Sequence, residues 1–94
     1  MKKTEMKFSI TGFRQELNIW TFAAAEINGK RFTIQFVRFD DPSQFGIDKG
    51  RVSKLWAKDE QIGTTIMNYD RGWDILPATA EAKAILRKIK KEFN

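Results

Sequence analysis

The chain has 94 residues, of which 41% are hydrophobic and 13% aromatic, so it suits one folded domain with a modest core. It contains no cysteine and no histidine, which excludes disulfides, thiolate nucleophiles, Cys/His zinc sites and imidazole acid/base catalysis. Seventeen basic and twelve acidic residues give a formal net charge of +5, which suits a polyanionic partner without identifying one.

The N-terminal segment, MKKTEMKFSIT, begins with a basic pair as a signal peptide does, but no apolar run of about seven residues follows it. We therefore expect a cytoplasmic protein. No stretch approaches the roughly 18 apolar residues of a membrane span. There are no internal repeats, low-complexity tracts or Gly/Ser linkers, so residues 1–94 are predicted to form a single domain.

The first three predicted strands follow from alternation and from one turn. Met6, Phe8 and Ile10 alternate with polar residues, which predicts an edge strand ending at Gly12. The INGK segment at 27–30 predicts a two-residue type I′ hairpin turn between strands at about 17–27 and 30–39. The turn sets a register that pairs small residues with large ones and opposite charges with each other. The predicted pairs are Glu26 with Arg31, Ala25 with Phe32, Ala23 with Ile34 and Thr21 with Phe36.

The middle of the chain predicts a loop and a second hairpin. Residues 40–50, DDPSQFGIDKG, contain a proline and two glycines and predict the loop. RVSKLWAK and TTIMNYD then predict two strands joined by the polar link DEQIG. Together with the first three, they predict five antiparallel strands in a meander.

The C-terminal segment predicts an amphipathic helix, with Thr79 as the cap and Glu81 in the first turn. The predicted fold class is therefore α+β, an antiparallel sheet of about five strands with one C-terminal helix packed on one face. The apolar residues at helical spacing are Ala82, Ile85, Leu86, Ile89 and Phe93. The sheet face expected beneath the helix carries Ile19, Thr21, Ala23, Ala25, Phe32, Ile34 and Phe36, because its alanines allow close approach.

One helix covers one face of a sheet, so apolar residues on the other face need a separate explanation. They gather at the end of the hairpin away from its turn. Such a patch predicts a binding surface for another protein or for a second copy of the chain. The alternative is that the sheet curls or the 40–50 loop folds over the patch. The predicted partner-binding residues are Trp20, Phe22, Val37 and Phe39.

Residues 69–74, YDRGWD, have two interpretations. In the structural one, Gly72 suits a turn or bulge at the end of a strand and the apolar residues are anchors. In the functional one, an arginine fork receives a carboxylate or phosphate between aromatic stacking faces. The candidate ligand-binding residues are Tyr69, Arg71, Trp73 and Asp74.

Residues 50–88 contain the pattern G-R-x-S-K-L-W and the YDRGWD turn followed by P-x-T-x-E-A. In these motifs the chain resembles a family of small uncharacterised proteins from phages and mobile elements of Gram-positive bacteria. The resemblance covers somewhat less than half of the chain and implies no activity and no functional residues. It implies a binding role, since small phage proteins of this kind often bind and block a host factor or hold a small ligand.

The leading functional hypothesis is a non-enzymatic interaction module that uses the aromatic patch, with a host protein or a second copy as partner. The alternative is nucleic-acid binding through the basic C-terminal helix. Against it, basic residues in the last turns of a helix are favoured by its dipole and usually form a solvated face, and the chain lacks an RNP-type aromatic signature. The candidate nucleic-acid-binding residues are Lys83, Arg87, Lys88, Lys90 and Lys91.

An enzyme would have to rely on carboxylates. Asp40 with Asp41, or Asp70 with Asp74, are the candidate pairs for holding Mg²⁺ or for acid/base work. Adjacent acids on a strand point to opposite faces, and two acids do not define a metal site. We therefore expect no catalysis, no metal and no cofactor.

Overall fold

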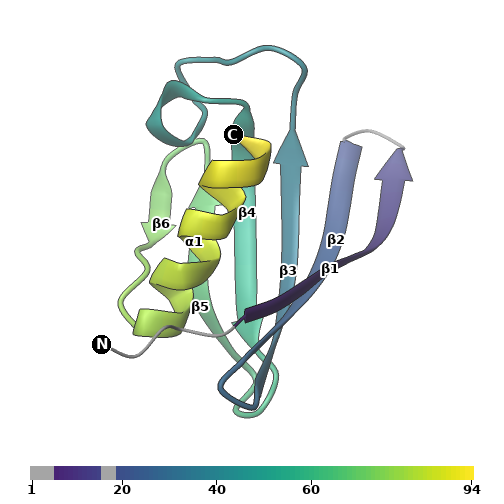
Figure 1. Ribbon diagram of the computed structural model, residues 1–94. Coiled ribbons are helices and arrows are strands. Elements are labelled where there is room, and N and C mark those ends of the chain that lie inside the picture. Colours follow the sequence, from purple (N-terminus) through teal and green to yellow (C-terminus); the bar gives the residue numbers. More distant parts are fainter. Residues whose placement is uncertain (1–5, 16–18) are drawn as a thin grey trace.

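The computed structural model describes residues 6–15 and 19–94 and has a twisted antiparallel sheet with one helix across it (Figure 1). In this part of the chain the sheet has six strands, whose order in the sheet is their order in the sequence. The predicted α+β class and the meander are confirmed, with one strand more than the five expected. The elements are β1 (Met6–Gln15), β2 (Ile19–Ile27), β3 (Lys30–Arg38), the 3-10 helix η1 (Ile47–Lys49), β4 (Val52–Asp59), β5 (Thr64–Asp70), β6 (Trp73–Ile75) and α1 (Ala80–Phe93).

The β2–β3 hairpin confirms the predicted turn and register. Asn28 and Gly29 have φ angles of 52° and 81°, as a type I′ turn requires. The four predicted pairs are all directly opposed. Residues 16–18, where the predicted strand begins, and the side chain of Ile19 lie outside the described residues.

β1 pairs with β2 and forms one edge of the sheet, as predicted. Its predicted end at Gly12 is wrong, because the strand continues to Gln15. The register with β2 shifts between Ile10 and Gly12, so the glycine marks a bulge instead of an end. A glycine inside an alternating pattern is compatible with a strand end and with a bulge, and only the pairing with the partner strand distinguishes the two.

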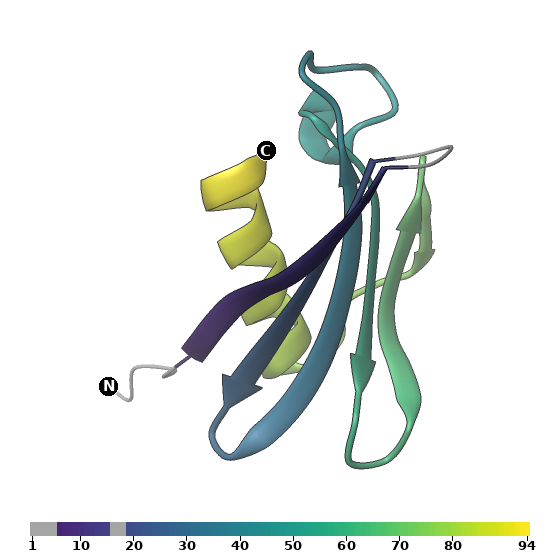
Figure 2. The same ribbon diagram turned by 90° about the vertical axis from the view of Figure 1, so that its right-hand side faces the viewer.

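The helix α1 begins where the sequence predicts. The Oγ1 atom of Thr79 accepts a hydrogen bond of 3.1 Å from the backbone N–H of Ala82, which satisfies one free donor of the first turn. Figure 2 shows α1 on one side of the sheet. Its residues Ala84, Ile85 and Ile89 share a buried cluster with Ala23, Ala25, Phe32, Ile34 and Phe36, which confirms the predicted face. No helix in the described part of the chain is long and apolar enough to cross a membrane.

The loop between β3 and β4 is anchored to the core and to the C-terminus. Ile47 is buried in the core cluster. The side chain of Asn94 accepts a hydrogen bond from the N–H of Val52 at 3.0 Å and donates one to the carbonyl of Ile47 at 2.8 Å. A side chain at Gly50 would overlap that of Asn94. The predicted loop is thus a fixed part of the fold, so its side chains have defined positions at the end of the sheet.

Candidate functional site

The sheet face turned away from α1 is the first candidate site, and we call it the open face (Figure 2). On β2, the residues facing α1 are buried whereas those between them are half-buried. Directly opposed residues of antiparallel strands share a face, so the register defines its members. The open face comprises Lys7, Ser9, Trp20, Phe22, Ala24, Glu26, Arg31, Thr33, Gln35, Val37, Lys54, Trp56, Lys58, Thr65, Asn68 and Asp70.

Three aromatic side chains lie among polar ones on this face. Phe22 is directly opposite Gln35, which is opposite Trp56, so an amide separates the two rings. Trp20 lies in the next row, opposite Val37. All three rings are half-buried. Adjacent strands are about 4.8 Å apart, so Phe22 and Trp56 lie roughly 10 Å apart, each with its own contact surface.

Trp56 was not predicted as a site residue. Its indole N–H donates to the hydroxyl of Thr65 at 3.1 Å, which orients the ring. The alternation of RVSKLWAK puts Trp56 on the same face as Lys54, but which face that is depends on the pairing of β4 with β3. The connection of 13 residues between Arg38 and Val52 is too long to fix this register as a tight hairpin turn does.

Basic side chains are interleaved with the rings. The Nζ atom of Lys54 is 5.9 Å from the centroid of the Trp20 ring and 3.8 Å from a carboxylate oxygen of Asp70. The first distance is within the range of a cation–π contact. Among the open-face side chains that the structure describes, four basic ones (Lys7, Arg31, Lys54, Lys58) stand against two acidic ones (Glu26, Asp70). The face therefore combines π surfaces with a small excess of positive charge.

The four residues of the predicted aromatic patch differ in exposure. Trp20 and Phe22 lie on the open face, whereas Val37 is completely buried there. The register shifts between Val37 and Arg38, where Ser53 is the extra residue on β4, so the bulge lies on β4. Phe39 is 46% exposed, begins the 39–51 loop and lines a hollow together with Val37 and Lys54.

The YDRGWD segment is a turn whose side chains reach in different directions. The hydroxyl of Tyr69 donates to the carbonyl of Phe45 at 2.8 Å, and its ring meets Trp73 edge-on at 5.0 Å. Burial, and secondarily the charge of Asp48, raise the pKa of Tyr69 above its ordinary value. Asp74 accepts a hydrogen bond of 3.4 Å from Asn68. The four predicted ligand-binding residues therefore do not converge on one ligand.

Arg71 is the member of this segment that lines a cavity. Its guanidinium carbon is 4.8 Å from the centroid of the Phe45 ring. The cavity, which we call the Arg71 hollow, has a volume of about 300 Å³ and lies where the loop meets the ends of β3 and β4. Its lining residues are Val37, Phe39, Ser43, Phe45, Ser53, Lys54 and Arg71.

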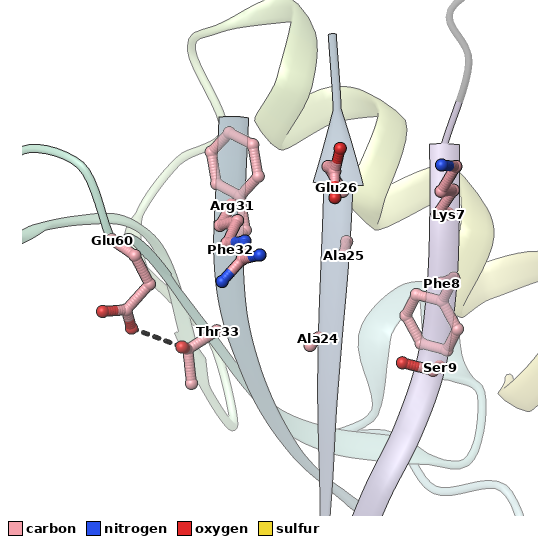
Figure 3. Close-up of a pocket in the computed structure, with 10 residues that line it drawn as sticks. All are labelled: Lys7, Phe8, Ser9, Ala24, Ala25, Glu26, Arg31, Phe32, Thr33 and Glu60. Carbon is pink, nitrogen blue, oxygen red and sulfur yellow. Dashed lines mark hydrogen bonds between the residues drawn. The ribbon is translucent and has the colours of Figure 1, made fainter. Parts of the chain in front are cut away.

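A second hollow of about 430 Å³ lies at the other end of the sheet, near the β2–β3 turn (Figure 3). Figure 3 shows the short side chains Ala24 and Ala25 on β2, between Arg31 on one neighbouring strand and Lys7 on the other. The hydroxyl of Thr33 donates to Glu60 at its margin. The lining contains two basic and two acidic residues, so it favours neither sign of charge.

The basic residues of α1 lie on the opposite side of the sheet from the open face (Figure 2). Lys88 pairs with Glu92 at 2.7 Å, and Lys90 pairs with Asp48 of η1. In the described part of the chain, the remaining three, Lys83, Arg87 and Lys91, are exposed and have no carboxylate within 4.0 Å. Because the sheet lies between, these cations and the open-face rings cannot contact the same short segment of a nucleic acid.

The candidate carboxylate pairs do not form a metal site. Asp70 faces Lys54, and Asp74 faces Asn68. Asp40 and Asp41 are exposed at the start of the 39–51 loop. Among residues 6–15 and 19–94, no group of three or more acidic side chains is placed to hold a metal ion.

Comparison with protein-family models gives one match, to a family described as a domain of unknown function, DUF7678, over residues 19–94. The match covers most of the chain, including β2 to α1, so the chain belongs to this family. No curated protein sequence and no solved structure matches the chain.

Proposed function

We propose that this member of the DUF7678 family is a non-enzymatic binding protein that holds single-stranded nucleic acid on its open face. The observation that carries the proposal is the alternation of rings with hydrogen-bonding and basic side chains across β2, β3 and β4. Proteins that bind single strands combine aromatic stacking surfaces with positive charge along the backbone path. Between Phe22 and Trp56, the amide of Gln35 is placed to contact base edges.

A dry protein interface fits this face less well. The centres of stable protein interfaces are depleted in charged residues. Here Lys54 lies over the Trp20 ring, in the middle of the aromatic group. Val37 is already buried, so it presents no apolar surface to a partner there. Burying Lys54 against an apolar partner would cost its hydration, and would also desolvate the exposed carboxylate of Asp70 that lies 3.8 Å from it.

The test measures binding of fluorescent oligothymidylate and of a duplex of equal length by anisotropy, from low to moderate salt. Trp56→Ala and Phe22→Ala should each weaken single-strand binding about tenfold, because stacking contributes about 1–3 kcal/mol per base. The matched control is Lys83→Gln with Arg87→Gln, which removes two exposed cations from the far side of the molecule. This control should bind almost as well as the wild type, and all variants should retain the wild-type circular dichroism spectrum.

Two results would contradict the proposal. If the helix variant loses binding and the ring variants keep it, the basic face of α1 is the nucleic-acid surface, as the alternative hypothesis holds. If the wild type binds neither oligonucleotide at low salt, nucleic acid is not the partner. A steep fall of affinity with salt should accompany any true phosphate contact.

Self-association is the second candidate, and the edge strand β1 favours it. Phe13 is 69% exposed and Ile10 is 38% exposed on this ten-residue strand. Long edge strands with apolar side chains tend to pair with other strands. Light scattering on a sizing column should then give a dimer that Phe13→Ser converts to a monomer. A wild type that stays monomeric at high concentration would reject self-association.

The predicted host-protein partner, phage context and cytoplasmic location remain predictions.

A further inference from the structure

The Arg71 hollow differs from the other hollow in the charge of its lining. Two basic residues, Lys54 and Arg71, line it together with two serines, and no acidic residue does. The hollow near the β2–β3 turn has two residues of each sign. The Arg71 hollow is also continuous with the open face, because Val37 and Lys54 belong to both.

Arg71 is held in place by its backbone and not by an ion pair. Its N–H donates to the carbonyl of Ser53 at 2.9 Å, and its φ of 60° turns the chain between β5 and β6. Within the described part of the chain, its guanidinium has no carboxylate within 4.0 Å and makes no hydrogen bond. The five N–H donors of an arginine side chain are therefore available to an anion.

Two phenylalanine rings border the same space. Phe39 is 46% exposed and Phe45 is 44% exposed. Phe45 is fixed by the bond from the Tyr69 hydroxyl to its carbonyl and by a bond of 3.2 Å from its N–H to the hydroxyl of Ser43. These bonds fix the backbone of Phe45, and the guanidinium carbon of Arg71 lies 4.8 Å from the centroid of its ring, so part of the site is formed before any ligand arrives. Pre-formed apolar walls with a few convergent polar groups are typical of ligand sites.

The lining specifies a ligand with a flat ring and an anionic group. A forked guanidinium and an ammonium match a phosphate, serine hydroxyls add donors, and the rings offer stacking surfaces. At about 300 Å³ the hollow is at the small end of the roughly 300–1,000 Å³ of ligand pockets, so it suits one nucleotide and not a chain of them.

We propose that the Arg71 hollow binds a nucleoside monophosphate unit, as the 5′-phosphorylated terminal nucleotide of the strand that the open face holds. The phosphate lies at Arg71 and Lys54, and the base packs against Phe39 or Phe45. This inference rests on the proposed function, since the neighbouring Trp20 ring takes the next base along the strand. A free mononucleotide offers the same chemistry, and the experiment separates the two sources.

The experiment compares 5′-phosphorylated and 5′-hydroxyl oligothymidylates of the same length, and free thymidine monophosphate, by anisotropy and by amide NMR. The wild type should prefer the phosphorylated strand about tenfold, and Arg71→Gln should abolish this preference. Arg71→Lys, which keeps the charge and loses the fork, should retain part of it. The matched control is Trp56→Ala, which should weaken both strands equally and leave their ratio unchanged.

The outcomes separate this inference from the proposed function. If both strands bind equally well and Trp56→Ala weakens both, the open face binds nucleic acid and the hollow inference is overturned. If neither strand binds but thymidine monophosphate shifts the amides of Ser43, Phe45 and Arg71, the hollow is a mononucleotide site and the proposed function fails. If no probe shifts those amides in a variant-sensitive way, the hollow is not a nucleotide site.

Discussion

Two of the tight turns that carry a glycine, at Asn28–Gly29 and at Arg71–Gly72, use positive φ angles differently. In the first, both residues have positive φ, and both are types that tolerate it. In the second, Arg71 has a φ of 60°, whereas Gly72 beside it has no positive φ. The first turn is exposed, and a side chain added at Gly29 would meet nothing within 4 Å. The second turn contacts the 39–51 loop, because the guanidinium of Arg71 lies over the ring of Phe45.

This difference separates a turn that only reverses the chain from one that also positions a side chain. The left-handed region costs a residue with a Cβ atom about 1–2 kcal/mol. At Arg71 the chain accepts that cost one residue away from a glycine. Backbone strain of this kind tends to occur at ligand sites, where the position of one group matters more than local stability. The guanidinium above Phe45 is the group that this turn positions.

The largest effect on stability is expected from a substitution that disrupts the 39–51 loop, against which the second turn packs. A side chain at Gly46 would overlap the backbone carbonyl of Gly50. Gly46→Ala should lower the free energy of unfolding by about 3 kcal/mol, measured by urea denaturation. Gly72→Ala is the matched control, since nothing lies within 4 Å of its added methyl, and it should change stability by less than about 0.5 kcal/mol. Equal effects would mean that the loop readjusts freely.

A smaller effect tests the link between the loop and β5. Tyr69→Phe removes the hydroxyl that donates to the Phe45 carbonyl. We expect a loss of about 1–2 kcal/mol in the free energy of unfolding, because a partly buried acceptor loses its partner. Phe45 should also lose its fixed position, seen as broadening of its NMR resonances. An unchanged melting temperature would show that Ile47 and Asn94 hold the loop without this bond.

Tyr69 also predicts a pH dependence of stability. Its folded pKa is raised above the ordinary value of 10.0, so the folded state keeps the phenol proton at a pH where the unfolded state loses it. Its contribution is therefore complete below about pH 10 and is lost as the pH rises through the folded pKa. Melting temperatures from pH 8 to 11 should fall more steeply in the wild type than in Tyr69→Phe. Parallel curves would contradict the shift.

The smallest effects on the free energy of unfolding are expected from one substitution in each of the two turns. Gly29→Ala should cost about 1 kcal/mol of unfolding free energy, because alanine does not tolerate positive φ. Arg71→Asn should change it by less than about 0.5 kcal/mol, since asparagine relieves the strain while the contact with Phe45 is lost. The same Arg71 variant should lose the preference for a 5′-phosphate. A larger loss of stability at Arg71 than at Gly29 would make the arginine a structural clamp.

Local patterns predicted the parts of the fold in which neighbours in sequence interact. The Asn-Gly turn set the β2–β3 register because two residues at positive φ leave one pairing. Thr79 and the spacing of Ile85 and Ile89 defined α1, because a helix cap and an apolar stripe also involve residues only a few positions apart. The end of β1 was missed because a bulge at Gly12 depends on its partner strand.

The candidate site was harder to predict because its parts come from distant segments. Arg71 and Trp20 were both identified as candidates, but in separate hypotheses. The ring of Phe45 was not identified, since a phenylalanine in a polar loop carries no pattern that assigns it a partner. Trp56 was missed because the long β3–β4 connection leaves the register of β4 open.

By itself, the sequence determined the α+β class, the meander, the hairpin register and the helix, because each depends on residues within a few positions of one another. The alanine-rich hairpin face was the best match for the helix, but the tertiary structure decided that the helix covers it. Only the tertiary structure decided that Val37 is buried within the aromatic group, that Trp56 joins it, and that Arg71 meets Phe45 above a hollow. These depend on bulges and on a loop anchored by Asn94 at the far end of the chain. Such contacts form only when the whole sheet has assembled, so no short window of sequence encodes them.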